Sequence, residues 1–326
     1  MAAAPRPAWR ILIVTPAPPR SYLGNAVTAL RWQSLLAGLG HQVVVTPSYD
    51  GQPCDLLVAL HARRSAGSIR AFAGQRPGVP IVIGLSGTDL YPDLATAGVD
   101  LDVLSLASRL VVLQALGLGQ LPRALRDRGR VIVQSAEPAR GASPPPAGVF
   151  LVAVLAHLRP VKDPLLAARA SRLLPAASVL KVDHLGASLD ARLAEEAKAE
   201  EASNPRYRWL GEVPQAEALR HLASSHLLAV TSRHEGGANV VSEALASSVP
   251  VVSSRIDGSV GLLGADYPGY FEPGDAAGLA ELLWRLERNS DGVLDRLRAH
   301  SQALRPLVDP VRERQAWEEL LAELGD

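Results

Sequence analysis

Short, continuous apolar runs recur along the 326-residue chain, with helical stretches between them. Such runs are typical of parallel strands that are buried on both faces, whereas half-exposed strands alternate apolar and polar residues. Parallel strands need crossover connections, so the pattern restricts the chain to an α/β architecture. The runs start at residues 11, 42, 55, 80, 109 and 130, and again at 149, 178, 207, 227 and 250.

A proline-rich segment separates the two sets of runs. Residues 137–148 contain four prolines and several small residues, which continue neither a helix nor a strand. The chain length also favours two domains over one. We therefore expect an N-terminal Rossmann-like domain over residues 1–140 and a second one over residues 149–305. An amphipathic helix predicted over about 308–326 is expected to pack back on the first domain.

The two domains are predicted to be doubly wound sheets that face each other across a cleft. Sheets of this kind bind ligands beyond the carboxyl ends of their strands. Residues that carry function are therefore expected directly after the apolar runs.

The charge balance and the single cysteine exclude several kinds of partner. Lysine plus arginine equals aspartate plus glutamate at 33 each, which gives no overall attraction to nucleic acid or an anionic membrane. One cysteine, Cys54, excludes an internal disulfide framework and fits a cytoplasmic setting. The N-terminal apolar run is too short for a signal peptide or a membrane span. A homodimer is compatible with these features.

The stretch "TSRHEGGANVVSEAL", residues 231–245, places Glu235 and Glu243 on either side of a predicted helix start. Taken alone, it fits an ordinary surface turn that leads into an amphipathic helix. It also follows an apolar run, and a helix start preceded by glycines is a ready site for a phosphate. We therefore predict that a nucleotide sugar binds here, with Glu235 at the sugar and Glu243 at the ribose. The other candidate donor-binding residues in this stretch are His234, Gly236, Gly237, Ala238, Asn239 and Val240.

A second turn, "AHLRPVKDP", follows the run that starts at residue 149. Arg159 and Lys162 are placed to neutralise a departing diphosphate, which is the electrostatic task of a transferase that uses no metal. The alternative is two solvated charges at a helix start. We expect no cofactor and no metal.

These motifs resemble the donor half of the large retaining glycosyltransferase family with the GT-B architecture, of the GT4 type with an E-x7-E pair. In that resemblance Glu235 and Glu243 form the pair, Lys162 is the family lysine, and Gly211 lies in a segment, "WLGEV", similar to the one that contacts uracil. The chain departs from the family at His157, where an arginine is usual, so Arg159 is expected to supply the missing charge.

Segments spread from residue 11 to about 285 are further similar to the selenosugar synthases of selenoneine biosynthesis. This resemblance implies transfer of a sugar from UDP-N-acetylglucosamine or UDP-glucose to the selenium of selenophosphate. Because that selenium is already anionic, positioning and charge neutralisation are expected to matter more than a strong base. A small anionic acceptor requires a polar pocket in the first domain. The candidate acceptor residues are Arg20, Gly24, Asn25, His61, Arg63, Arg64 and Thr88, with His61 or Asp89 as an orienting group or base.

Two other functions remain open on the sequence. One is a glycosyltransferase of the same type that acts on a hydroxyl acceptor, and the other is a nucleotide-sugar epimerase or sensor of the same fold. The D-x-D pattern of Asp100 and Asp102 is interpreted as a helix cap rather than a metal site. "HEGGA" lacks the second histidine of a zinc protease, and no phosphate-binding G-x4-G-K-[ST] loop or G-x-S-x-G elbow is present.

Overall fold

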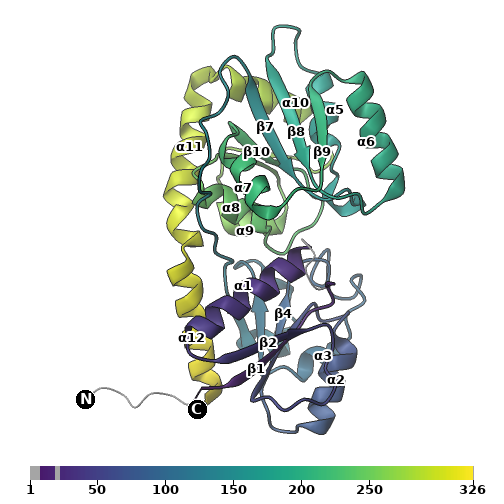
Figure 1. Ribbon diagram of the computed structural model, residues 1–326, viewed down its shortest axis with the longest axis vertical. Helices are drawn as coiled ribbons and strands as arrows, with labels where there is room; N and C mark the ends of the chain where they lie inside the picture. The colour runs from purple at the N-terminus through teal and green to yellow at the C-terminus, as the bar shows by residue number, and fades with distance from the viewer. Residues whose placement is uncertain (1–7, 19–22, 326) are drawn as a thin grey trace, which may run out of the picture. The chain divides into compact units, whose positions relative to one another are not determined.

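The computed structural model describes residues 8–18 and 23–325. The chain divides into two compact units, one of Met1–Gln134 with Val311–Asp326 and one of Ser135–Pro310. Each unit contains a six-stranded sheet whose paired strands are all parallel (Figure 1). The prediction of an α/β fold with two doubly wound sheets is therefore confirmed.

The sheet of the first unit has the strand order β2-β1-β3-β4-β5-β6. Its strands are β1 (Arg10–Val14), β2 (Gln42–Thr46), β3 (Leu56–Leu60), β4 (Ile81–Leu85), β5 (Arg109–Val112) and β6 (Gly129–Val131). Its helices are α1 (Gly24–Gly38), α2 (Ala66–Gln75), α3 (Leu101–Ser105), α4 (Gly117–Gln120) and α12 (Pro310–Gly325), with a 3-10 turn η1 (Arg123–Arg128). From β1 the chain moves outward to β2, and from β3 it moves the other way, so the switch point lies between β1 and β3.

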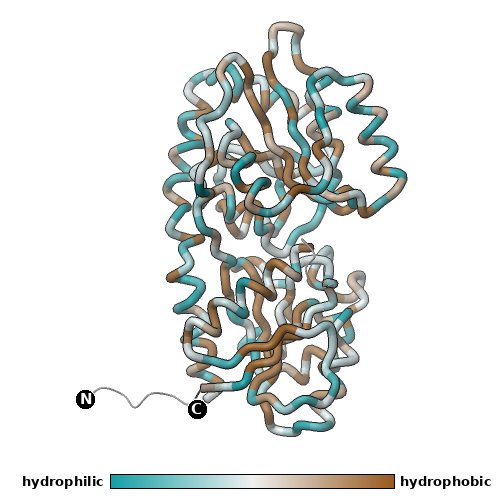
Figure 2. The backbone as a smooth tube through the Cα atoms, in the orientation of Figure 1, coloured by the Kyte–Doolittle hydropathy of each residue, from teal (hydrophilic) through white to brown (hydrophobic). Residues whose placement is uncertain are grey.

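The alternation of side chains along β1 explains why this sheet is covered on both faces. Leu12 and Val14 belong to one buried cluster, which includes Phe72 of α2. Ile11 and Ile13 belong to a second cluster, which includes residues of α1 and α12. Successive strand residues point to opposite faces, so each face needs its own helical layer. Figure 2 shows the hydrophobic residues concentrated along these strands.

Helix α12 is fixed to the first unit by a pair of indole rings. Trp317 meets Trp32 of α1 edge-on, with ring centroids 4.9 Å apart, and both side chains are fully buried. Trp32 also donates a hydrogen bond of 2.9 Å to Glu313 Oε1. Gly84 in β4 leaves room for this packing, because a Cβ there would lie 3.0 Å from the Trp32 ring. At the other end of the helix, Glu323 pairs with arginines of β5 and β6.

The sheet of the second unit has the strand order β12-β11-β10-β7-β8-β9. Its strands are β7 (Phe150–Leu155), β8 (Leu180–Leu185), β9 (Tyr207–Gly211), β10 (Leu227–Val230), β11 (Val251–Ser254) and β12 (Tyr270–Phe271). Its helices are α5 (Leu166–Arg172), α6 (Ala191–Ser203), α7 (Gln215–Ala223), α8 (Asn239–Ala246), α9 (Asp257–Leu263), α10 (Ala276–Glu287) and α11 (Val293–Leu304), with 3-10 turns η2 (Pro160–Lys162), η3 (Ser290–Gly292) and η4 (Arg305–Val308). The eleven predicted runs all form strands, and β12 was not predicted because it has only two residues.

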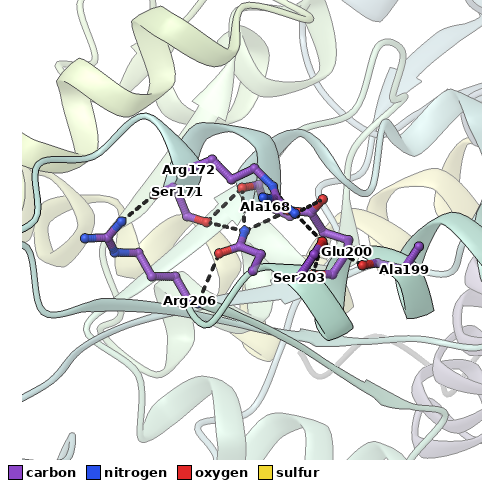
Figure 3. A network of polar contacts seen from close by, with 8 residues as sticks. Ala168, Ser171, Arg172, Ala199, Glu200, Ser203 and Arg206 are labelled. Carbon is purple, nitrogen blue, oxygen red and sulfur yellow. Dashed lines mark hydrogen bonds and ion pairs between the residues drawn. The ribbon is translucent and has the colours of Figure 1, made fainter.

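A polar network joins α5 to α6 next to the start of β9 (Figure 3). Asn204 donates hydrogen bonds to Ser171 Oγ at 3.0 Å and to Glu200 Oε1 at 2.7 Å. Arg172 pairs with Glu200 and donates to Ser203 Oγ at 2.6 Å. These bonds satisfy polar groups at helix ends and fix the helical layer on this side of the sheet.

Candidate functional site

The switch point of the second sheet lies between β7 and β10, which are neighbours in the sheet although two strands, β8 and β9, separate them in sequence. The segments that follow these two strands therefore leave the sheet side by side. After β7 comes the turn that contains Arg159 and Lys162, and after β10 comes the loop that contains Glu235. The topology thus brings together the two motifs that the sequence singled out.

Lys162 and Glu235 form an ion pair between these two segments. The Lys162 ammonium donates to Glu235 Oε1, which also accepts a hydrogen bond of 2.7 Å from Ser232 Oγ. Two more hydrogen bonds reach the backbone of the lysine turn: the Thr231 side chain donates through Oγ1 to the Lys162 carbonyl at 2.9 Å, and Arg233 N donates to the Val161 carbonyl at 2.8 Å. The lysine turn and the glutamate loop are therefore one connected structure.

Asp163 directly follows this turn and has a left-handed backbone conformation, with φ of 40°. Its buried carboxylate accepts hydrogen bonds from Arg169 at 2.6 Å and from Arg233 at 2.9 Å. Arg159 has no such carboxylate among the residues that the structure describes; it directly precedes the turn and is half-buried. Arg159 is therefore available to a bound anion.

The turn after β7 is also tied to the neighbouring strand β8. His184 is fully buried, and its Nε2 donates to the Ala156 carbonyl at 2.8 Å, so its Nδ1 accepts from the Tyr207 hydroxyl at 2.8 Å. Burial lowers the pKa of His184 to about 4. His157, the departure from the family pattern, accepts a hydrogen bond of 3.0 Å from Ala187 N at its Nδ1. An imidazole that accepts at Nδ1 is neutral, so His157 does not replace the charge of an arginine while this bond is made.

Helix α8 begins beside the pair, at Asn239, as the sequence predicted. Ala238 precedes it in an extended conformation and its side chain offers no cap, and in the first turn Val241 N donates to the Ala238 carbonyl at 2.9 Å. Among the remaining predicted donor residues, Gly236 is buried, Gly237, Val240 and Glu243 are half-buried, and His234 is exposed. Gly211 ends β9 with φ of 71°, a conformation that favours glycine.

A second polar cluster lies in the first unit, at the switch point between β1 and β3. Asp89 is fully buried, and its carboxylate accepts hydrogen bonds of 3.0 Å from the backbone N–H groups of Ala62, Ser86 and Gly87. Ser86 Oγ in turn donates to Asn25 Oδ1 at 2.8 Å. Both Asp89 oxygens thus accept hydrogen bonds inside the fold, which join the segments after β3 and β4.

His61 is the centre of the cluster and has an unusual backbone conformation, with φ of 68°. Its Nε2 lies 3.2 Å from Thr88 Oγ1, and its Nδ1 lies 3.8 Å from Asp89 Oδ2. Burial lowers the pKa of His61, against the opposing effect of Asp89. A non-glycine residue in this conformation costs free energy and is often found at functional sites.

Of the other predicted acceptor residues, only some contact this cluster. Asn25 is bonded to it, whereas Arg63 and Arg64 extend from the turn after His61 and are exposed. Gly24 begins α1. Arg20 lies outside the described residues.

Several residues of both clusters were not predicted as site residues. Ser86, Thr231, Ser232 and His184 make the hydrogen bonds that fix the predicted groups. Ser86, Ser232 and Thr231 could have been found from the sequence, because they come directly after apolar runs or at their ends. His184 carried no signal, because it lies inside an apolar run.

The interpretation of Asp100 as a helix cap is confirmed. It precedes α3 and accepts a hydrogen bond of 2.9 Å from Asp102 N. The same side chain pairs with Arg70. These contacts account for the carboxylate of Asp100, whereas Asp102 takes part through its backbone N–H.

Two parallel six-stranded sheets, with motif-bearing loops at a switch point, define a GT-B glycosyltransferase fold. Residues 136–303 match the family of glycosyl transferases group 1, and the chain belongs to that family. Similar solved structures include HepE from Anabaena in complex with UDP and glucose, with 18% identity, a TM-score of 0.75, and coverage of 97% of this chain and 100% of HepE. A sucrose-phosphate synthase from Thermosynechococcus elongatus has 16% identity and a TM-score of 0.72, with coverage of 96% and 99%. A glycosyltransferase from Rickettsia africae has 14% identity and a TM-score of 0.74, with coverage of 97% and 98%.

Among the described residues, no helix is both long and apolar enough to span a membrane.

Proposed function

We propose that this chain transfers a sugar from UDP-N-acetylglucosamine or UDP-glucose to selenophosphate, forming a carbon–selenium bond. The main support for a UDP-sugar donor site is the ion pair of Lys162 with Glu235 near the start of α8. Membership of the glycosyl transferases group 1 supports a transferase, and HepE, solved with UDP-glucose, supports a UDP-sugar donor.

The Lys162–Glu235 pair suggests how the donor engages the site. The incoming diphosphate attracts Lys162 away from Glu235, and the released carboxylate is then free to accept hydrogen bonds from the sugar hydroxyls. During transfer, a selenium lone pair forms the bond to the anomeric carbon as the bond from that carbon to the diphosphate oxygen breaks. The electron pair of the broken bond goes to the diphosphate, where Lys162 and Arg159 stabilise the charge.

The same two cations support transfer without a metal. A metal ion in such reactions neutralises the departing diphosphate, and Lys162 and Arg159 offer that charge at the end of β7. We therefore propose that the activity needs no divalent cation.

The acceptor assignment rests on the similarity to selenosugar synthases and on the charges near His61. Arg63 and Arg64 are exposed and near enough to His61 to influence its titration, so an anion bound beside His61 is met by positive charge. Selenophosphate is such an anion, and its selenium needs no base to remove a proton.

The cluster around His61 also favours a second candidate, transfer to a hydroxyl acceptor. His61 lies between the half-buried hydroxyl of Thr88, 3.2 Å from its Nε2, and the buried carboxylate of Asp89, 3.8 Å from its Nδ1. A neutral histidine supported by a carboxylate is a suitable general base for a hydroxyl group. Selenophosphate gains nothing from such a base, so the two candidates differ in their need for it.

The test is a transfer assay with each UDP-sugar and selenophosphate, in which released UDP and a selenium-containing sugar are measured by mass spectrometry. We expect UDP release that depends on selenophosphate, withstands a metal chelator, and falls by about a hundredfold or more in Lys162→Ala. The control is Lys198→Ala, since Lys198 forms an ion pair with Glu195 on the exposed face of α6, away from the β7 and β10 loops.

Three results would contradict the proposal. UDP release that selenophosphate does not change, but that a panel of sugar and polyol hydroxyls increases, would favour the second candidate. UDP-sugar binding without any transfer would indicate a sensor, and conversion of one UDP-sugar into another would indicate an epimerase. Loss of activity with the chelator would refute metal independence alone.

A further inference from the structure

We propose that Gly258, at the start of α9, is a positioning residue for Glu235. The proposal rests on the proposed function, because it assumes that Glu235 acts on the donor sugar. Gly258 is far from Glu235 in sequence and carries no side chain, so it acts through the space that it leaves empty.

The contact is between two backbones. An ideal Cβ on Gly258 would lie 2.7 Å from the Glu235 carbonyl carbon and 2.9 Å from Glu235 Cβ, and closer still to the Glu235 carbonyl oxygen. Cβ atoms do not approach backbone atoms this closely, so any other residue at 258 displaces one of the two segments. The absence of a side chain at Gly258 thus allows the start of α9 to pack directly against the backbone of Glu235.

Helix α9 is not free to move away. Gly258, Ser259, Leu262 and Leu263 are all buried, and Ser259 Oγ lies 2.7 Å from Ser253 Oγ of β11. The preceding strand also holds the loop, because Ser254 Oγ donates to the Ser232 carbonyl. The displacement caused by a larger residue is therefore passed to Glu235.

On its other side, the glutamate loop is held by the lysine turn. Glu235 accepts from Lys162 and Ser232, and Thr231 bonds the Lys162 carbonyl. A shift of the Glu235 backbone alters these short bonds and moves the carboxylate from its place at the donor. Misplacement of a reacting group by about 1 Å costs up to about a hundredfold in rate.

The experiment compares Gly258→Ala with Gly67→Ala in the same transfer assay. Gly67 is a matched control, since it is also the second residue of its helix, α2, and an added Cβ meets nothing within 4 Å. We expect Gly258→Ala to lower kcat about tenfold to a hundredfold while the Kd for UDP alone stays within about threefold. Gly67→Ala is expected to match the wild type in both.

A double-mutant cycle separates positioning from a general loss of structure. If Gly258 acts through Glu235, adding Gly258→Ala to Glu235→Ala lowers kcat no further. Additive losses, or unchanged turnover in Gly258→Ala, would overturn the proposal. A wild-type chain without transfer activity would refute the proposed function instead, so the two failures are distinct.

A second variant covers the case in which Gly258→Ala does not fold. Ser254→Ala removes the bond to the Ser232 carbonyl without adding an atom. We expect a smaller fall in kcat, again absent in the Glu235→Ala background. Unchanged turnover of Ser254→Ala, when Gly258→Ala cannot be measured, would count against the proposal.

Discussion

At the residue scale, most charged side chains around the Lys162 turn form ion pairs with one another. Lys162 neutralises Glu235, and Asp163 accepts from both Arg169 and Arg233. Pairing lowers the free-energy cost of burying these charges in the empty protein until a ligand arrives. Arg159 is the cation of this region that the described residues leave without a carboxylate.

The two glutamates of the loop and of α8 are predicted to have different roles. Glu243→Ala is expected to weaken UDP binding by about tenfold, because it removes a partner of the ribose hydroxyls. Glu235→Ala is expected to lower kcat chiefly, because it acts on the sugar. Calorimetric UDP binding and steady-state turnover distinguish them, and normal values for both variants would show that the donor does not bind here.

Buried His184 is predicted to make stability depend on pH. Its pKa is lowered to about 4 by burial, whereas an unfolded histidine has its ordinary value of 6.5. The unfolded chain therefore binds more protons between these values, so the free energy of unfolding rises with pH from about 4 to 6.5, by about 3 kcal/mol from this residue. The contribution is complete above pH 6.5 and is lost as pH falls.

Urea unfolding measured from pH 4 to 7 by circular dichroism checks this prediction. His184→Gln is expected to have a smaller slope than the wild type over that range. The exposed His300 supplies the control, because His300→Gln is expected to keep the slope. Equal slopes in the wild type and His184→Gln would refute the assignment.

The sequence pattern singled out the candidate site residues but not the residues that contact them. Glu235 and Lys162 were recognisable because they follow apolar runs, and parallel strand order brings such positions together. Gly258 and His184 act through a backbone approach and a buried carbonyl, which depend on how segments distant in sequence are packed. Neither the spacing nor the residue type signals such contacts.

At the element scale, α12 is part of the first hydrophobic core. It contributes Trp317, Leu320 and Leu321 to the cluster that covers one face of the β1 sheet. The Trp317 indole nitrogen has no hydrogen-bond partner among the described residues, so the ring contributes by packing alone. The helix therefore belongs to the first unit as firmly as α1 does.

Trp317→Ala is predicted to destabilise the first unit by about 3–5 kcal/mol, the usual cost of removing a buried aromatic ring. Val311→Ala on the same helix is the control, because Val311 is 57% exposed and its loss is expected to change stability by less than about 0.5 kcal/mol. Urea unfolding followed by tryptophan fluorescence and circular dichroism measures both. A Trp317→Ala chain as stable as the wild type would show that α12 is not part of the core.

At the scale of the whole molecule, the chain leaves the first unit at Gln134 and returns to it at Val311. The fold class, the strand positions and the α/β nature of each unit could be predicted, because apolar runs and proline-rich breaks are local signals. The bonds that tie α12 into the core could not, since they join Glu313 and Glu323 to residues about two hundred or more positions away.

The return of α12 has a consequence for biosynthesis. A ribosome makes the first unit's sheet early but supplies its last core helix only after the whole of Ser135–Pro310 has been made. Domains usually fold in the order of their synthesis. Here the later unit has all of its own segments first, while the earlier one still lacks α12 over the face of its sheet that α1 also covers. The nascent chain is therefore most exposed to aggregation and to chaperones at its N-terminal half, until synthesis is nearly complete.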